Sequence, residues 1–464
     1  MTWPTALWLA LRGGRSDRLR VLLTVAATSL ASLLVLLAVA VTTPGDPERM
    51  SPYANDGLWS NRDLTPGAVL GIGLVALPFL AFAAQCSRVG GPARDRRFLD
   101  LERLGTSRRE LRRLAALESG VASVVGTLVG IPLYALLAFV IARVGAPVAQ
   151  YPPEGTPVRV WSPDALLLPT DRFPTWWVAL PAMLLLPVLV SAMATTGLAR
   201  TTERTASESP RRYWSAALVV GGVVFAALAI VVADRLHIAA SWLFTLLALV
   251  ALAAFALGAA GLTGDLGVLL GRALARTAGR VDLLLAGSRL QAHRRTGASR
   301  LTLLLGCLMG GAALVTRDQA SEQSARQGDI AGFFEQTYML VLVGLGVATV
   351  MSALGVLVGE VESIVERRRS LASAVASGVP RSSIRRAVVV ECLLPVVPAV
   401  VVTTSVGAVA AAGLVAAVDR SAVLPWGPLL IFVAGVSMAV LVAALVATLA
   451  LPASTDISEV RVPA

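Results

Sequence analysis

The chain has 464 residues, of which 56% are hydrophobic and only 15% are charged, and its mean hydropathy is +0.74. A soluble core does not use that much apolar surface, so the composition excludes an ordinary soluble domain and indicates many membrane-spanning segments. The formal net charge is +11, yet a nucleic-acid-binding protein needs a basic face on a soluble module, which this sequence lacks. We therefore expect no nucleic-acid partner, and we attribute the charge to orientation in a bilayer and to attraction to anionic membrane lipids.

Apolar segments long enough to cross a bilayer recur along the whole chain. About 20 apolar residues are needed to cross the hydrocarbon layer, and on that rule the sequence predicts ten transmembrane helices. They cover residues 21–41, 68–86, 114–142, 176–198, 213–233, 238–262, 301–316, 336–358, 387–417 and 429–451. The predicted fold is therefore an all-α polytopic membrane protein.

The distribution of basic residues predicts how the spans are oriented. All 40 basic residues are arginines, and 31 of them fall on the cytoplasmic side when the N-terminus is placed in the cytoplasm. Short loops rich in basic residues stay on that side, so we expect a multi-pass protein with N- and C-termini in the cytoplasm. The use of arginine without lysine, together with high alanine and valine content, fits a GC-rich bacterial gene and hence a bacterial plasma (cell) membrane.

Two inner segments of the sequence resemble each other at a constant offset of 273 residues. Residues 105–118 read GTSRRELRRLAALE, and residues 378–391 read GVPRSSIRRAVVVE. The matched pairs are Gly105 and Gly378, Arg108 and Arg381, Leu111 and Ile384, Arg112 and Arg385, Arg113 and Arg386, Glu118 and Glu391, and, upstream, Arg96 and Arg369. The chain is therefore a duplicated protein in which each copy joins an inner segment to a span.

The duplication predicts the domain organisation. Two units of four spans each would occupy residues 1–200 and 276–464, joined by a two-helix linker at 201–275. A four-span unit begins and ends on the same side of the membrane, so a linker of two spans keeps the two units parallel. Each unit would begin with a basic segment, at 8–20 and 285–300, which is either a short helix in the headgroup layer or a plain basic flank.

The outer segments are too short for a large extracellular domain. The longest ones cover residues 42–67, 143–175 and 317–335. The middle one is rich in proline and contains Trp161, with Trp176 and Trp177 at the start of the next span. We favour an interfacial belt of aromatic side chains for these tryptophans over a lid that recognises a substrate.

Each inner repeat has the pattern of two helices joined at a glycine. In the first copy, Phe98, Leu101 and Leu104 fall on one face of a short helix that would end at Gly105. Glycine suits the left-handed position that follows a helix C-terminus, and Gly378 would end the matching helix in the second copy. A basic loop that only fixes topology would not need a glycine at the same place twice.

The helix that follows each glycine has a predicted start and a predicted ion pair. Ser107 and Glu110 fit a capping box, and Pro380 takes the place of Ser107 in the second copy, as the first turn of a helix allows. Glu118 and Glu391 lie about one turn inside their spans. We expect each glutamate to pair with the two arginines that precede it by five or six residues, rather than to relay protons.

Several kinds of catalytic chemistry lack the residues that they require. The chain contains no lysine, so it has no Walker A loop and does not hydrolyse ATP by itself; we expect no enzyme. His237 and His293 are the only histidines, which leaves little material for a metal site. Cys86, Cys307 and Cys392 show no CxxC spacing, so neither a disulfide framework nor a zinc site is expected.

Together these features resemble the FtsX-like permease family, the membrane subunits of type VII ABC transporters. The second copy is the closer match: an acidic and basic run at 366–369, an apolar helix at 371–378, and a segment at 381–391 that is similar to the family pattern GxxRxxIRR followed by a glutamate. The first copy diverges more, because Asp95 stands where the second copy has Arg368. The resemblance covers most of the chain except 213–262.

The resemblance implies how the repeats would work. In the family, a short coupling helix docks in a groove of a cytoplasmic ABC ATP-binding subunit, so two copies of that subunit would bind this chain. ATP and Mg²⁺ would belong to the partner ATPase, and this chain would carry no cofactor of its own. The implied ATPase-coupling residues are Arg96, Leu101, Leu104, Gly105, Arg108, Arg112, Arg113 and Glu118 in the first copy, and Arg369, Leu371, Gly378, Arg381, Ile384, Arg385, Arg386 and Glu391 in the second.

Three functions follow as hypotheses. The first is a permease subunit of an ATP-driven ABC transporter that exports or extracts a lipid, a hydrophobic drug or an antimicrobial peptide. The second is a signalling or mechanotransmission subunit that acts on an outer partner. The third is a secondary transporter, which ranks last because the span centres hold no ionisable residue.

Overall fold

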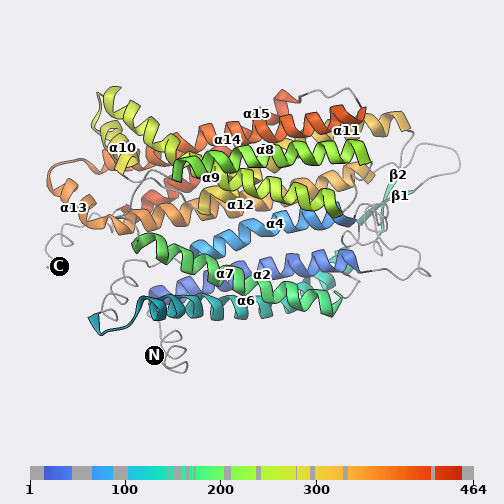
Figure 1. Cartoon of the computed structure of the whole chain (residues 1–464), viewed down its shortest axis with the longest axis horizontal. Helices are drawn as coiled ribbons and strands as arrows, with labels where there is room; N and C mark the ends of the chain where they lie inside the picture. The colour runs from blue at the N-terminus through green and yellow to red at the C-terminus, as the bar shows by residue number, and fades with distance from the viewer. Residues whose placement is uncertain are drawn as a thin grey trace.

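The computed structural model describes residues 15–43, 65–86, 103–144, 146–150, 158–162, 168, 170, 174–202, 211–236, 242–277, 279–292, 298–327, 333–419 and 424–451. In this part the chain is a bundle of long helices that run roughly side by side (Figure 1). Two short helices lie at one end of the bundle, and a β-hairpin lies at the other (Figure 1).

Long helices occupy the positions of the ten predicted spans. They are α2 (Arg15–Thr42), α4 (Thr65–Cys86), α6 (Arg108–Val144), α7 (Trp176–Thr202), α8 (Arg211–Leu236), α9 (Trp242–Thr277), α11 (Ala298–Gln327), α12 (Phe333–Glu366), α14 (Arg381–Asp419) and α15 (Trp426–Ala447). The short helices are α10 (Val281–Ala292) and α13 (Arg368–Ala376), and a 3₁₀ turn, η1 (Thr448–Ala450), follows α15.

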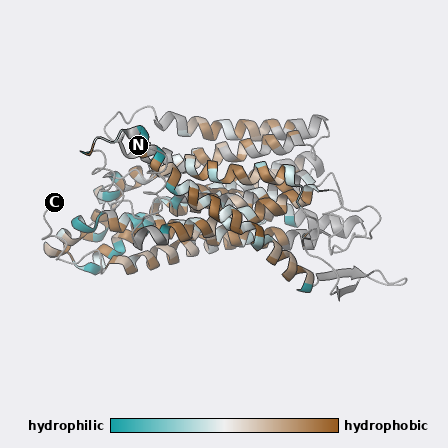
Figure 2. Ribbon diagram, turned by 90° about the horizontal axis from the view of Figure 1, so that it is seen from below, coloured by the Kyte–Doolittle hydropathy of each residue, from teal (hydrophilic) through white to brown (hydrophobic). Residues whose placement is uncertain are grey.

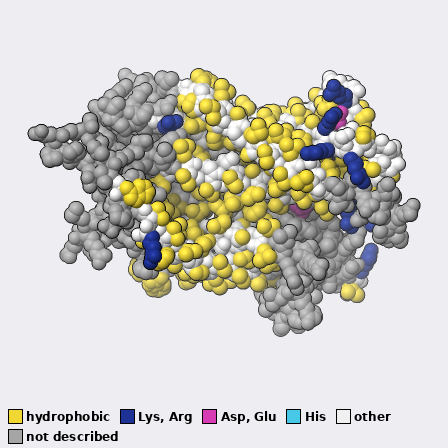
Figure 3. All heavy atoms as spheres, turned by 180° about the vertical axis from the view of Figure 1, so that it is seen from behind, with side chains coloured by type: hydrophobic (Ala, Val, Ile, Leu, Met, Phe, Trp, Pro, Cys, Tyr) yellow, Lys and Arg dark blue, Asp and Glu magenta, His cyan; other side chains and the backbone are white. Residues whose placement is uncertain are grey.

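Seven helices in the described part are long and apolar enough to cross a membrane, namely α2, α6, α9, α11, α12, α14 and α15. In α4, α7 and α8 the apolar stretches are shorter, at Gly71–Ala83, Trp176–Ala192 and Ser215–Leu228. Hydrophobic residues colour most of the bundle in Figure 2, and Figure 3 shows an apolar surface across its middle with arginines gathered mainly at one end. The chain is thus a multi-pass membrane protein, while the count of ten spans stays a prediction.

The structure differs from an all-α fold at one place. β1 (Ala146–Gln150) and β2 (Val158–Ser162) pair antiparallel, with Ala146 opposite Ser162 and Gln150 opposite Val158. Valine and tryptophan in β2 favour a strand. Residues 143–175 are rich in proline, which disfavours strand interiors, but three of these prolines lie between the two strands.

The helices that belong to each predicted unit pack on one another in the same way. α2 packs on α4 and α6, and α6 packs on α7; likewise α11 packs on α12 and α14, and α14 packs on α15. α4 and α12, the second helices of the two halves, pack together between them. The linker helices α8 and α9 form a hairpin that lies mainly against α11 and α14. That these halves are two related units stays a prediction, with which these contacts agree.

Glycines allow the first and third helices of each half to approach closely. A Cβ atom on Gly126 of α6 would overlap the Thr28 hydroxyl of α2, and one on Gly407 of α14 would overlap the Leu308 carbonyl oxygen of α11. Small residues at crossings between membrane helices bring the backbones together and increase van der Waals contact. These crossings fix α6 and α14, the helices that carry the repeated segments.

Candidate functional site

The two repeated inner segments lead into their long helices at equivalent residues. α6 begins at Arg108 and α14 begins at Arg381, which keeps the offset of 273 residues. The glycine three residues before each helix has a left-handed backbone, with φ of +90° at Gly105 and +94° at Gly378. Glycine adopts this conformation without the steric cost of a Cβ atom. The predicted left-handed glycines are therefore confirmed in both copies.

In the second copy, Gly378 closes α13 through a Schellman motif. The Gly378 N–H donates to the Val375 carbonyl at 3.0 Å, and the Val379 N–H donates to the Ala374 carbonyl at 3.0 Å. These two bonds satisfy carbonyl groups at the end of the helix that would otherwise lack partners. The chain then turns sharply into α14, so that α13 is held between the end of α12 and the start of α14.

One apolar side chain anchors α13 to the bundle. Leu371 is buried, as is Ala372 beside it. Leu371 joins a cluster whose other buried members come from α12, α14, α15 and the end of the bundle, namely Ile364, Ile384, Val388, Ala447 and Leu451. Movement of α13 would therefore displace the side chains of three long helices, because packed side chains transmit strain.

In the first copy, a capping box begins α6. The Ser107 N–H donates to Glu110 Oε2 at 3.0 Å, and the Glu110 N–H donates to Ser107 Oγ at 3.4 Å. The predicted capping box is therefore confirmed. Leu104, next to Gly105, is 82% exposed, whereas Leu111 on the following helix is buried. An exposed leucine at this tip is a surface that a partner could cover.

The buried glutamates have partners that differ from the expected ones. Glu118 accepts a hydrogen bond from Arg20 of α2 at 3.1 Å, and Glu391 accepts one from Arg367, between α12 and α13, at 3.1 Å. Each of these bonds links the glutamate to an arginine outside its own helix, and the expected partner Arg112 has its side chain outside the described residues. A residue five or six positions earlier on an α-helix points 120° to 140° away, and Arg113, Arg385 and Arg386 face the exposed side. The buried glutamates face inward.

Both ion pairs are buried, and each joins two elements. The side chains of Arg20 and Glu118 are 8% and 4% exposed, and those of Arg367 and Glu391 are 16% and 2% exposed. The first pair ties α6 to α2, and the second ties α14 to the turn before α13. Removal of one partner from a buried ion pair leaves an uncompensated charge and costs about 3–5 kcal/mol.

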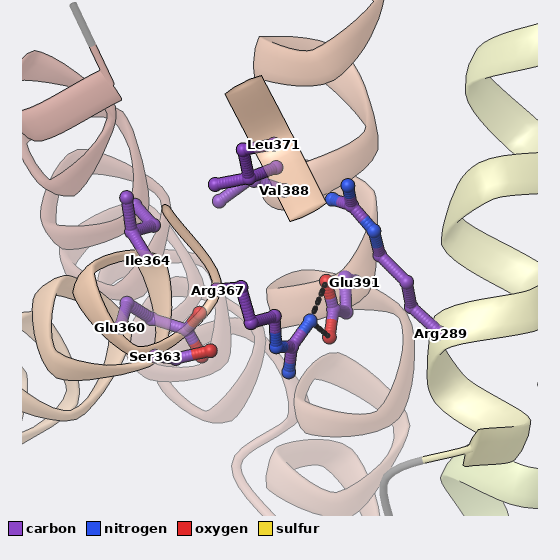
Figure 4. Close-up of a pocket in the computed structure, with 8 residues that line it drawn as sticks. All are labelled: Arg289, Glu360, Ser363, Ile364, Arg367, Leu371, Val388 and Glu391. Atoms are coloured by element: carbon purple, nitrogen blue, oxygen red, sulfur yellow. Dashed lines mark hydrogen bonds and ion pairs between the residues drawn. The ribbon is translucent and has the colours of Figure 1, made fainter. Parts of the chain in front are cut away.

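The second ion pair lies in a small pocket with charged and apolar lining (Figure 4), with room for about one water molecule. Its lining comes from α10, α12, the turn before α13, α13 itself and α14, and consists of Arg289, Glu360, Ser363, Ile364, Arg367, Leu371, Val388 and Glu391. Glu360 and Glu391 share this lining with Arg289 and Arg367, and the printed bond joins Arg367 to Glu391. The pocket is too small for a substrate; it is a junction between helices.

The remaining candidate arginines form an exposed basic surface at this end. The exposed ones are Arg113, Arg369, Arg381, Arg385 and Arg386. Arg96 and Leu101 lie outside the described residues, as do the side chains of Arg108 and Arg112. Positive charge near a helix N-terminus opposes the helix dipole. Arginines in the first turns of α6 and α14 therefore do not serve helix stability, and an anionic surface outside the chain would favour them.

Within the described residues, no group of three or more His, Cys, Asp and Glu side chains is arranged to hold a metal ion. Cys86, Cys307 and Cys392 are free thiols and all are buried. The opposite end of the bundle is aromatic: Trp176 and Trp177 pack edge to face at 5.6 Å between ring centroids and are exposed. Trp161 in the hairpin is exposed too.

The charged residues of the site that the sequence did not predict are Arg20, Arg289, Glu360 and, as an ion-pair partner, Arg367. Arg20 lies 98 residues from Glu118 in the sequence. One signal pointed to it, since Arg20 precedes Thr24 and Thr28 at helical spacing on the buried face of α2. No comparable pattern marked Arg289 or Glu360.

No family model matches the chain, and no curated protein or solved structure matches it. The resemblance of the inner repeats therefore rests on the residues themselves.

Proposed function

We propose that the chain is the permease subunit of an ATP-driven transporter of the FtsX-like type, which couples a separate cytoplasmic ATPase to export or extraction of an amphiphilic molecule. The observation that carries the proposal is the recurrence at the two inner segments. Each has a left-handed glycine, a long helix that begins at the equivalent residue, and a buried glutamate in an ion pair. A loop that only fixed topology would need positive charge and none of these.

The contacts of α13 support a path for mechanical coupling. A force on α13 would pass through Leu371 into the apolar cluster beneath it and through the Arg367–Glu391 ion pair into α14. α14 packs closely on α11, so it would move with its neighbour rather than bend alone. In the first copy the corresponding glutamate, Glu118, instead connects α6 to α2 through Arg20.

The partner would be a cytoplasmic ATP-binding subunit in two copies, one at each repeat. The exposed arginines and Leu104 would form the docking surfaces, and ATP and Mg²⁺ would bind in the partner. The chain would then lie in the bacterial plasma membrane with its arginine-rich end and both termini inside. Because the outer segments are too short for a large extracellular domain, the substrate would be a lipid, a hydrophobic drug or an antimicrobial peptide.

The test is ATPase activity that copurifies with the tagged chain from its own membranes. Arg385→Ala/Arg386→Ala should reduce hydrolysis of Mg²⁺-ATP in the purified material at least about tenfold. The control is Arg143→Ala/Arg317→Ala, which removes the same charge from exposed positions of α6 and α11 and should leave activity unchanged. Absence of any ATPase from the wild-type preparation, or equal activity in both double variants, would refute the proposal.

The β-hairpin favours a second function, transmission of a signal to an outer partner. The hairpin and the exposed tryptophans lie at the end of the bundle opposite α13, where such a partner would bind. Replacement of residues 146–162 by a short Gly/Ser linker should then abolish function in cells while ATPase copurification persists. Unimpaired function of this variant would exclude the second hypothesis.

A further inference from the structure

The linker helices end in a close contact with α10. A Cβ atom on Gly271 would lie 2.8 Å from the Gly287 carbonyl oxygen, and one on Gly287 would lie 3.0 Å from the Ala275 backbone nitrogen. The Gln291 side chain donates a 3.1 Å hydrogen bond to the Gly271 carbonyl oxygen. Glycines let these backbones approach closely, so α9 and α10 form one closely packed hairpin, which we call the α9–α10 clasp.

The clasp packs against α14 about one helical turn from the ion pair of Glu391. A Cβ atom on Gly267 would lie 3.6 Å from Pro395 and 3.7 Å from Leu290, in ordinary van der Waals contact. Leu290 is buried, and Pro395 lies one helical turn after Glu391. Proline removes a backbone hydrogen bond and bends a helix. The clasp therefore supports α14 at a point where its own backbone is weakened.

Arg289 extends from the clasp into the pocket around the second ion pair. Its side chain lines the pocket together with Glu391, Glu360 and Arg367, and in the view of Figure 4 Glu391 lies between the side chains of Arg367 and Arg289. Glu360 and Glu391 are both buried, at 7% and 2% exposure. Two buried carboxylates in one pocket favour more than one cation nearby, and Arg289 of α10 is the second arginine of this lining.

We infer that the α9–α10 clasp is part of the coupling apparatus, and that Arg289 is a positioning residue that fixes α13 by holding Glu391 and Glu360 in place for Arg367. The linker helix α9 thus does more than connect the two halves: through its contact with α10 it helps to set the position of the inner helix of the second half. The inference rests on the proposed function where it concerns coupling, but the positioning of α13 can be measured without any ATPase.

The experiment is hydrogen exchange on the purified full chain in lipid nanodiscs. Arg289→Ala should lower the protection of the α13 amides, Arg368–Ala376, at least about tenfold, while the amides of α6 stay unchanged. Arg289→Lys should restore most of the protection. Gly287→Val keeps the arginine but separates α10 from α9, and should lower the protection of α13 as well. Matched controls outside the clasp are Arg143→Ala and Gly435→Ala, since Arg143 is exposed and a Cβ on Gly435 meets nothing within 4 Å.

The outcomes separate this inference from the proposed function. Unchanged α13 protection in Arg289→Ala, while Arg367→Ala lowers it, would overturn the positioning role, as would equal loss of protection throughout the chain. Local loss in α13 without any change in copurified ATPase activity would support the clasp and refute coupling through α13. If no ATPase activity copurifies with the wild-type chain, the proposed function is refuted. The hydrogen-exchange data still test the role of Arg289.

Discussion

Glu118 and Glu391 occupy equivalent positions, ten residues after the first residue of α6 and of α14, yet they bind arginines from different parts of the chain. A carboxylate this deeply buried must be compensated, because the interior does not solvate charge. The same glutamate can therefore connect its helix either to the first helix of its half or to the inner helix. The duplicated residue is retained while its partner has changed.

We expect Glu118→Gln to lower the free energy of unfolding by about 3 kcal/mol, because Arg20 would be left as a buried charge without its carboxylate. The measurement is denaturation of the purified chain in mild detergent. The matched control is Arg113→Ala, an exposed residue of the same helix, for which we expect a change within about 0.5 kcal/mol. Equal effects of the two substitutions would contradict the importance of the buried pair.

We expect Gly378→Ala to cost about 1–2 kcal/mol, because a Cβ atom is strained at its φ of +94°. The space around Gly378 is open, with nothing within 4 Å of a Cβ atom, so backbone strain is the cause rather than overlap. Gly378→Asn should cost less than Gly378→Ala, since asparagine tolerates the left-handed region better. Unfolding in detergent measures both. If the two variants were equally destabilised, strain would not be the explanation.

Both special glycines were predictable from the sequence, because the preference for glycine after a helix C-terminus is local. The ion pairs were not predictable. Arg20 and Glu118 are 98 residues apart in the sequence, and only the crossing of α2 and α6 brings them together. Arg367 was visible as part of the basic run before α13, but nothing in the sequence set it apart from its neighbours.

Among the elements, α6 and α14 depend on close crossings with α2 and α11. Small residues allow these crossings. On α2, Thr28 donates a hydrogen bond to the Thr24 carbonyl of its own helix, and Ser32 donates one to the Thr127 carbonyl of α6. The Ser32 bond crosses between helices, so it contributes to the association of α2 with α6.

Gly407→Ala should destabilise the second half by about 2 kcal/mol, because its methyl group would overlap the Leu308 carbonyl oxygen of α11. Gly413→Ala in the same helix is the control, since a Cβ atom there meets nothing within 4 Å. It should be neutral or stabilising by up to about 1 kcal/mol. Thermal unfolding in detergent compares them. Equal stability of the two variants would show that the crossing can relax.

The sequence predicted the positions of the long helices well, since a long apolar run is a strong signal. It did not predict the β-hairpin, whose strands, five residues each, carry a weak local signal interrupted by prolines. It also could not show that α9 continues past its apolar part to pair with α10, because that contact depends on glycines in two different helices.

At the scale of the whole molecule, the two halves meet where α4 packs on α12. A Cβ atom on Gly344 would lie 3.0 Å from Val75, and one on Gly355 would lie 2.6 Å from the Gln85 amide oxygen. Met351 and Val358 of α12 pack against the apolar cluster of α4. Any relative motion of the halves therefore requires repacking along this contact, which the duplication of the sequence alone did not reveal.

The orientation of the whole bundle can be tested with cysteines at its two ends. Trp161 and Arg369 are exposed and lie at the hairpin end and the α13 end. We expect a membrane-impermeant maleimide to label Trp161→Cys in intact cells and Arg369→Cys only after the cells are permeabilised. The reverse pattern would invert the predicted topology, and with it the side on which an ATPase could bind.

The burial of the three natural cysteines has a practical consequence. Cys86, Cys307 and Cys392 are each at most 1% exposed, so water-soluble thiol reagents should not reach them in the folded protein. The folded natural chain should therefore not react with these reagents, and none of its three cysteines needs to be replaced before a labelling experiment. Labelling of the natural chain would indicate that the protein has unfolded. In a variant with one introduced cysteine, labelling of the folded protein would report the accessibility of that position alone.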